Sequence, residues 1–273
     1  MIDIHIHGIS NLGIEDLISI AKLLKQRGVE GFLPTIYPSS IHKMREDMAI
    51  TRDAFSHQTQ EQAKILGLHL EGPFLNPLKA GALNSNFFLQ PTEYNLEKLI
   101  DGFEDFIKII TLAPELAGAM KLIKKITDKG IIVSLGHSDA TFDIANKAYN
   151  SGAKGITHIF NAMRGFHHRE PGLAGFGLLN KDIFIEVIAD PFHLHAETLK
   201  MIFKVKNKDR IIIVSDSVRN EKGSSSGIKN EKEILCGGSF ILDKSLEWLI
   251  EIGVSKGDLL KAVSDNPKRY LSL

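Results

Sequence analysis

Three things are scarce in this chain of 273 residues: cysteine, net charge and long apolar runs. Cys236 is the only cysteine, so an intramolecular disulfide is excluded, and we expect a reducing, cytoplasmic location. The 33 basic and 33 acidic residues cancel, which argues against nucleic acid or an anionic membrane as a partner. No apolar stretch approaches the ~20 residues of a membrane span. The chain starts directly on a strand-like run, so we expect no signal peptide.

What is present is an alternation of apolar, β-branched runs with amphipathic stretches, in a chain that is 43% hydrophobic. The pattern predicts strands at residues 2–6, 31–36, 64–70, 106–112, 131–136, 155–160, 183–189 and 210–215. It predicts helices at residues 14–26, 41–55, 94–103, 116–129, 141–151 and 195–205, and further helices in the tail at 238–252 and 255–264.

Strands that alternate with helices predict an α/β fold with parallel strands and right-handed crossovers. A closed (β/α)8 TIM-type barrel and a doubly wound open sheet both satisfy this pattern. We favour the barrel because polar residues follow strands scattered along the whole chain, and only closure brings those strand ends around one centre. Such a barrel commonly runs ~250 residues as one unit. We therefore expect residues 1–273 to form a single domain.

Histidine and acidic residues stand at the ends of the first, third, fifth, sixth and eighth predicted strands. On the first strand two histidines are two positions apart, so both side chains point to the same side. In a barrel these strand ends meet at one face, which is where the active sites of such barrels lie. The residues concerned are His5, His7, Glu71, His137, His158 and Asp216.

Glu71, His137 and His158 together offer one carboxylate and two imidazoles. This is a common ligand set for a catalytic zinc that keeps an open position for water. His5 and His7 could hold a second metal, with Glu71 as the bridge. Zinc is favoured, although iron, cobalt and manganese also suit these ligands, and one or two ions per subunit are compatible with the sequence.

Asp216 is the candidate that accepts a proton from water and returns it to a leaving group. Each candidate also has an ordinary structural role open to it. Glu71 could cap the Gly-Pro turn that follows it, and Asp216 could begin a helix. His137 could stand beside a helix cap, and His158 could be a hydrogen-bonded core residue. Taken singly these roles are the more frequent, but the shared position at strand ends favours metal-dependent hydrolysis.

Short motifs run along the chain in a characteristic order. They are DIHIHG (3–8), GLHLEGPFLNP (67–77), LAPE (112–115), GHSDAT (136–141), THIFNAM (157–163), HHREPGLAG (167–175), ADPFHLH (189–195), VSD (214–216) and NP (266–267). In this series the chain resembles the N-acetylglucosamine-6-phosphate deacetylases of the amidohydrolase superfamily, over nearly its whole length. The combination of HLEGPF, THIFNAM and HHREPGLAG is specific to that family.

The resemblance implies hydrolysis of the acetamido group of N-acetylglucosamine 6-phosphate, which yields glucosamine 6-phosphate and acetate. It implies that Glu71, His137 and His158 are the primary metal ligands. It also implies that His5 and His7 are a second metal pair, which some members of the family have lost. A small amino sugar phosphate would then be the partner of the site.

The same resemblance implies roles for residues that bind substrate. Asp216 matches the catalytic acid and base, and His193 matches the residue that polarises the substrate carbonyl. Asn161 and the backbone amide of Ala162 match contacts to the phosphate and the sugar. Arg169 matches an arginine that reaches the site of the neighbouring subunit, so a homodimer is implied. The planar fork of arginine suits a phosphate group, which a lysine would not reproduce.

The chain departs from the family pattern at several places. Leu83 stands where the family has a histidine that contacts the sugar, and leucine cannot donate a hydrogen bond. Pro191 replaces a glycine and should stiffen the loop that carries His193. Serines flank Asp216 in place of threonine and alanine, and the insertion after it is shorter. Its polar residues 222–233 could form either a solvated loop or a lid.

The family's flanking segments, which form a small β-sandwich, have no counterpart in these 273 residues, so the resemblance implies a shortened member. Two alternatives follow from the departures. Leu83 keeps open a related amidohydrolase that acts on another N-acetylated sugar or a cyclic amide. The missing flanking segments keep open a non-catalytic barrel that binds a sugar phosphate or a partner protein. Retention of every metal and acid residue favours hydrolysis.

Overall fold

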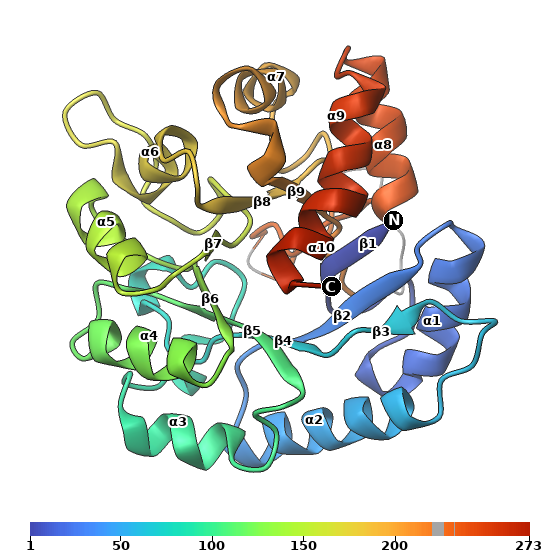
Figure 1. The fold of residues 1–273 in the computed structure, drawn as a ribbon, viewed down its shortest axis with the longest axis horizontal. Coiled ribbons are helices and arrows are strands. Elements are labelled where there is room, and N and C mark those ends of the chain that lie inside the picture. The colour runs from blue at the N-terminus through green and yellow to red at the C-terminus, as the bar shows by residue number, and fades with distance from the viewer. Residues whose placement is uncertain (220–226, 232) are drawn as a thin grey trace.

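A computed structural model describes residues 1–219, 227–231 and 233–273 of the chain. Parallel strands form a central barrel and helices surround it (Figure 1). Each strand pairs with the next in the order β1 (Ile2–Ile6), β2 (Gly31–Ile36), β4 (Leu68–Glu71), β5 (Ile107–Leu112), β6 (Ile132–Leu135), β7 (Gly155–Ile156), β8 (Phe184–Ile188) and β9 (Ile211–Val214). The short β3 (Lys64–Ile65) pairs with β2 beside this path.

The barrel closes between β1 and β9. Backbone hydrogen bonds join the residues at the carboxyl ends of these two strands. The amide of Asp216 donates to the carbonyl of His5 at 2.8 Å, and the amide of His7 donates to the carbonyl of Ser217 at 2.8 Å. The predicted (β/α)8 barrel is therefore confirmed, and the open doubly wound sheet is excluded. Closure joins two of the strands whose ends carry candidate site residues.

Helices cover the outer face of the strands (Figure 1). They are α1 (Leu17–Gln26), α2 (Ile41–Ser56), α3 (Glu93–Ile100), α4 (Ala119–Asp128), α5 (Phe142–Asn150), α6 (Gly172–Leu179), α7 (Ala196–Val205), α8 (Leu242–Glu251), α9 (Lys256–Leu260) and α10 (Asn266–Leu271). Most follow the predicted amphipathic stretches, and Ser40, Thr92 and Thr141 cap the first turns of α2, α3 and α5 with their side-chain oxygens. None of the described helices has the length and apolarity needed to traverse a bilayer.

Two local predictions were wrong and one helix was missed, each for a physical reason. The strand expected at 64–70 is split at Gly67, whose backbone φ of +137° interrupts the extended chain. The strand expected at 155–160 ends after Ile156, because His158 and Phe160 take left-handed conformations. Helix α6 was not predicted, because its sequence GLAGFGLL has no polar face. It is buried along nearly all its length, as a uniformly apolar helix must be.

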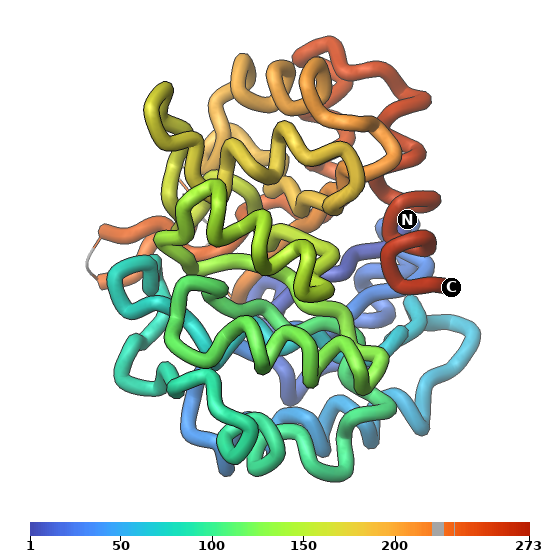
Figure 2. Tube along the Cα trace, turned by 60° about the vertical axis from the view of Figure 1, so that its left-hand side comes forward, coloured from blue at the N-terminus to red at the C-terminus, as the bar shows by residue number. Residues whose placement is uncertain are grey.

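The loops after the strands gather on one side of the molecule. Figure 2 shows the loops after β4, β7 and β9 on the left, while both chain termini lie on the right. These loops follow the carboxyl ends of the strands, so this side is the one that carries the candidate residues. Residues 220–226 and 232 lie outside the described residues, and they include much of the segment 222–233 interpreted above as a loop or a lid.

The last helix, α10, covers the opposite end of the barrel. Its Tyr270 is buried and its ring lies 4.9 Å from that of Phe184, the first residue of β8. The Tyr270 hydroxyl reaches Gly155, the first residue of β7, so closely that a Cβ there would lie 1.9 Å from it. The tail therefore packs back on the barrel, and Gly155 is required for that contact.

We expect Gly155→Ala to lower the free energy of unfolding by about 1–3 kcal/mol, because the added methyl group forces the buried Tyr270 ring to move. Tyr270→Phe removes the nearest atom, so the double variant should lose less than the sum of the two single changes. Urea unfolding would measure all three. Gly257→Ala, where a Cβ meets open space, is the control and should leave stability unchanged or slightly raised. An unaltered midpoint for Gly155→Ala would contradict the packing described.

Candidate active site

The ends of three strands carry site residues in an unusual backbone conformation. His137 after β6, His158 after β7 and Asp216 after β9 have φ values of +47°, +30° and +46°. Residues other than glycine seldom adopt this left-handed region, and each case costs of the order of 1–3 kcal/mol. The strain turns the chain at the strand end, and the three side chains line one cavity. Such strain is concentrated at functional sites.

Glu71, His137 and His158 form the first side-chain cluster. Oε1 of Glu71 lies 3.0 Å from Nε2 of His137 and 2.9 Å from Nε2 of His158. The two Nε2 atoms are 3.2 Å apart. All three residues are buried, and their ligand atoms are close enough together to hold one metal ion. The glutamate and two imidazoles expected from the sequence thus converge on one point.

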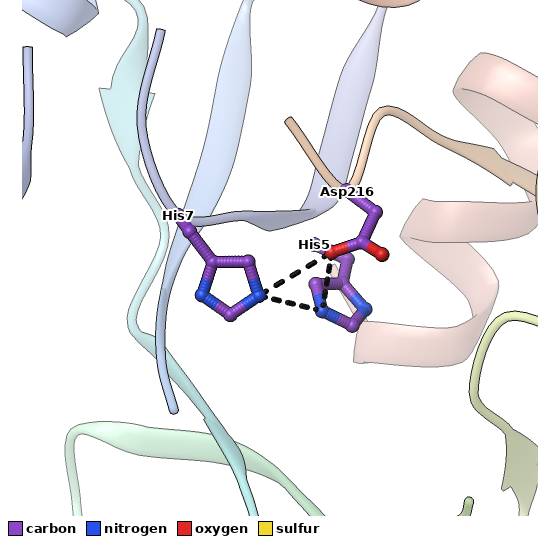
Figure 3. Close-up of side chains that lie close together, drawn as sticks. All are labelled: His5, His7 and Asp216. Atoms are coloured by element: carbon purple, nitrogen blue, oxygen red, sulfur yellow. Dashed lines mark hydrogen bonds and ion pairs between the residues drawn. The ribbon is translucent and has the colours of Figure 1, made fainter. Parts of the chain in front are cut away.

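His5, His7 and Asp216 form the second cluster (Figure 3). Oδ1 of Asp216 lies 3.2 Å from Nε2 of His5 and 3.3 Å from Nε2 of His7. The two histidine Nε2 atoms are 3.2 Å apart, so both rings point to the same place as the His-x-His spacing predicted. Glu71 stands between the clusters, with Oε2 only 3.3 Å from Nε2 of His7. One carboxylate therefore connects the two groups.

The outer nitrogens of two of these rings, those of His7 and His137, are held by backbone carbonyls. Nδ1 of His7 lies 3.0 Å from the carbonyl oxygen of Thr35, and Nδ1 of His137 lies 2.9 Å from that of Lys79. A carbonyl only accepts, so each Nδ1 carries a proton, and Nε2 is the ring nitrogen that faces the cluster. Metal-binding histidines typically have such an outer partner. The donor set thus fits a divalent metal.

His5 has a charged outer partner that sequence analysis missed. Nδ1 of His5 lies 2.9 Å from Oε2 of Glu186, a buried residue of β8. A carboxylate inside the otherwise apolar run 183–189 is the signal that could have identified it. Nδ1 of His158, by contrast, is buried with no hydrogen-bond partner among the described residues.

Electrostatics at the site favour positive charge. Burial opposes protonation of His5, but the carboxylates of Asp216 and Glu186 outweigh it and raise its pKa to about 10. Against the same burial, hydrogen bonds with Asp216 and Glu71 raise the pKa of His7 to about 9. Burial also opposes ionisation of Glu71, yet hydrogen bonds from the surrounding imidazoles hold its pKa well below its usual value. A metal cation would take the place of these protons.

A cavity of about 680 Å³ opens above the clusters. Most of the residues selected from the sequence line it, whereas His5 lies fully buried behind them. The predicted residues in the cavity wall are His7, Glu71, His137, His158, Asn161, Ala162, His193 and Asp216. Arg169 is exposed and is not among the described residues of this wall.

The loop that carries Leu83 crosses directly over the first cluster. A Cβ on Gly81 would lie 3.3 Å from Cβ of Ala162 and 3.7 Å from Cε1 of His137. Leu83 itself lines the cavity. The position at which the chain departs from the family pattern therefore faces the site, where a side chain can touch a bound molecule.

Two further acidic residues position the site and were given no role from the sequence. Glu115 accepts hydrogen bonds from the side chains of Asn76 (2.8 Å) and Ser138 (2.7 Å), which joins the loops after β4 and β6. Asp190 contacts Nδ1 of His193 at 3.0 Å. The two partners of Glu115 come from loops that only the folded barrel brings together, whereas Asp190 and His193 belong to the same loop.

The relatives found by comparison with known proteins are named as deacetylases of amino sugar phosphates, although no family model matches the chain. It is 34% identical over 96% of its length to the N-acetylglucosamine-6-phosphate deacetylase of Bacillus subtilis and spans 66% of that protein. It is 36% identical over its full length to the enzyme of that name from Lysinibacillus sphaericus and spans 75% of it. A 32% identical relative from Escherichia coli, of which it spans 77%, is named N-acetylgalactosamine-6-phosphate deacetylase.

Among solved structures, N-acetylglucosamine-6-phosphate deacetylase from Thermotoga maritima superposes with a TM-score of 0.89 at 30% sequence identity. The match covers 99% of this chain and 77% of that one. The chain thus spans 66% to 77% of the length of these proteins, and its barrel matches that of the Thermotoga protein.

Proposed function

The chain belongs to the N-acetylglucosamine-6-phosphate deacetylase family of amidohydrolases, and on that premise we propose that it hydrolyses the acetamido group of N-acetylglucosamine 6-phosphate. The products are glucosamine 6-phosphate and acetate. One observation carries the proposal: five strand ends bring together two clusters of ligand atoms, connected by Glu71, and every member except the buried His5 lines one cavity. A sugar-binding module without catalysis gives no physical reason for this concentration of strained and buried charged residues.

Glu71, His137 and His158 would hold a divalent metal, for which zinc is the favoured ion. His5 and His7 would hold a second ion, with Glu71 shared between the sites. When bound, such a metal would lower the pKa of a water molecule and polarise an oxygen of the substrate.

Asp216 is suited to move the proton. Burial opposes its ionisation, but the charges and hydrogen bonds of His5 and His7 lower its pKa below the usual value, so it starts as a carboxylate. It lines the cavity, where it takes a proton from the attacking water and delivers it to the departing nitrogen. His193 approaches from the neighbouring strand, β8, and would donate a hydrogen bond to the acetamido oxygen.

The sugar phosphate would be held by Asn161 and the amide of Ala162, with Arg169 supplied by a second copy of the chain. The described basic residues of the cavity wall are Arg219 and Lys229, and each already pairs with a carboxylate, at 2.9 and 3.0 Å. Neither residue matches a phosphate contact of the family, so we assign the cation at the phosphate to Arg169. Arg169 lies exposed outside the cavity of its own chain, which suits donation to a neighbour in a homodimer.

We expect Arg169→Ala to raise KM for N-acetylglucosamine 6-phosphate about 10- to 100-fold, because a charge-assisted contact worth about 1.5–3 kcal/mol is lost. KM for unphosphorylated N-acetylglucosamine should change little. Steady-state kinetics with both sugars gives the comparison. Arg27→Ala, which removes a surface pair with Asp243, is the matched control. Equal changes for the two sugars would remove the phosphate role.

A second candidate substrate is N-acetylgalactosamine 6-phosphate. The Escherichia coli relative carries that name, and Leu83 lines the cavity at the position where the family pattern has a histidine that contacts the sugar. The gluco and galacto sugars differ in the stereochemistry of one hydroxyl group, so the side chain at position 83 would help to select between them.

We further propose that the 273 residues act as one hydrolase domain, in the cytoplasm.

Acetate release from the two phosphosugars and from N-acetylglucosamine, with zinc-loaded protein, tests the proposal. Release from N-acetylglucosamine 6-phosphate in preference to the other two supports it. Preference for the galacto sugar would move the assignment to the second candidate. Absence of release from every N-acetylated sugar, by protein that holds metal, would contradict deacetylation.

A further inference from the structure

Asp190 is a fully buried carboxylate just after β8, three positions before His193. Its Oδ1 accepts hydrogen bonds from the backbone amides of Phe192 (2.9 Å) and His193 (2.8 Å). Its Oδ2 accepts one from the amide of Ser239 at 3.1 Å. Backbone donors thus occupy both oxygens, and they come from two separate segments of the chain.

These donors establish the charge of Asp190. A carboxylate that accepts several backbone N–H bonds is strongly stabilised in its ionised form. Burial opposes ionisation, but the contacts with His193 and the amides hold the pKa of Asp190 below its usual value. At neutral pH Asp190 is therefore an acceptor at both oxygens.

Nδ1 of His193 lies 3.1 Å from Oδ1 and 3.0 Å from Oδ2 of this carboxylate. An ionised carboxylate has no proton to give, so Nδ1 must carry one. The remaining nitrogen, Nε2, then has two possible states. In a neutral ring it holds a lone pair and can only accept, whereas in the doubly protonated ring it donates. Donation to a carbonyl oxygen is possible only for the second state.

We propose that Asp190 is a positioning residue that holds His193 as an imidazolium, so that Nε2 donates to the acetamido oxygen of the substrate. This inference rests on the proposed function, which assigns that oxygen to His193. A charged donor makes a hydrogen bond about twice as strong as a neutral one. It also acts where negative charge develops on the oxygen during the reaction.

The segment that donates to Asp190, at Gly238 and Ser239, also donates a hydrogen bond to the backbone of Asp216. The amide of Gly238 donates to the carbonyl oxygen of Asp216 at 2.7 Å, and the next amide, that of Ser239, donates to Asp190. A Cβ on Gly238 would lie 1.8 Å from the carbonyl oxygen of Ser215, so only glycine allows this approach. Consecutive amides therefore align the proton-transfer residue and the counter-ion of His193.

Nitrogen NMR of zinc-loaded protein with ¹⁵N-labelled histidine tests the protonation state directly. Comparison with His193→Gln identifies the His193 resonances. We expect both ring nitrogens to be protonated at neutral pH in the native protein, and one of them to lose its proton in Asp190→Asn. A singly protonated His193 in the native protein would overturn the proposal, whether or not any variant folds.

Kinetics supply the second readout. Asp190→Asn should lower kcat about 10²-fold, the usual effect of losing one donor to a developing oxyanion. KM should stay within about twofold, because the interaction forms mainly in the transition state. Metal content should be unchanged. Asp243→Asn, a surface carboxylate paired with Arg27 at 3.0 Å, is the matched control. An unchanged kcat in Asp190→Asn would refute the role.

The two proposals fail in distinguishable ways. If the native protein releases no acetate from any sugar, the proposed function fails, and NMR still decides whether Asp190 holds an imidazolium. If acetate is released but His193 is neutral, the function stands and the role of Asp190 is refuted.

Discussion

Glu71→Gln is expected to prevent metal binding and to lower acetate release at least about 10³-fold, because the metal contributes several kcal/mol of transition-state stabilisation. Glu71 contacts both clusters, at 3.0 Å from Nε2 of His137 and 3.3 Å from Nε2 of His7. Glutamine keeps the shape but replaces a charged oxygen with an amide nitrogen that cannot bind a cation. Both ions should therefore be lost from the protein.

Elemental analysis of the purified variant, together with acetate release, measures the effect of Glu71→Gln. Glu247→Gln is the matched control, because its carboxylate only pairs with Lys244 on the surface of α8. The control should retain native metal content and activity. A Glu71→Gln protein that binds metal at native stoichiometry, or that hydrolyses substrate at the native rate, would show that the clusters are not the metal centre.

Asp216→Asn is expected to lower kcat about 10²- to 10⁴-fold, the range for removal of a general acid and base. The variant should keep metal at Glu71, His137 and His158, because Asp216 belongs to the other cluster. KM should change little, since the proton is moved only during the reaction. The same kinetic and elemental measurements apply, and Asp243→Asn again serves as the control.

The two variants separate metal binding from proton transfer. Glu71→Gln should lose both, whereas Asp216→Asn should lose the chemistry and retain at least one ion. If Asp216→Asn instead lost all its metal and Glu71→Gln kept it, the assignment of the two clusters would have to be reversed. A kcat within about twofold of native for Asp216→Asn would exclude it as the acid and base.

The barrel and the cluster residues were readable from the sequence because parallel strands share an end. Once His5, Glu71 and Asp216 were placed at the ends of strands, closure alone required them to meet. Closure brings Asp216 and His5 into direct contact, through the hydrogen bond between the amide of Asp216 and the carbonyl of His5. The spacing of His5 and His7 needed only the twofold repeat of a strand.

The residues that orient the site were not readable in the same way. Asp190 receives an amide from Ser239, and Glu115 receives a hydroxyl from Ser138, and neither pair has any sequence pattern that links its members. Their function depends on loops whose paths are established by packing. Glu186 is the exception, since a charge inside an apolar strand run marks it as a residue that needs a buried partner.

The predicted end of a strand was wrong where the site imposes a strained backbone conformation. β7 is shorter than its apolar run because His158 must leave the strand in a left-handed conformation to reach Glu71. The apolar pattern of residues 155–160 records burial, which continues after the strand ends. Local sequence rules therefore fail at the point where the structure departs from regular geometry for the sake of the site.

Acetate release from N-acetylglucosamine 6-phosphate, measured before and after removal of bound metal with a chelator, is the decisive measurement. We predict that release stops when the metal is removed and returns when zinc is restored, in proportion to the zinc bound. Release that continues without metal would contradict the proposed centre at Glu71, His137 and His158. Failure of fully metal-loaded protein to release acetate would contradict deacetylation of this sugar phosphate.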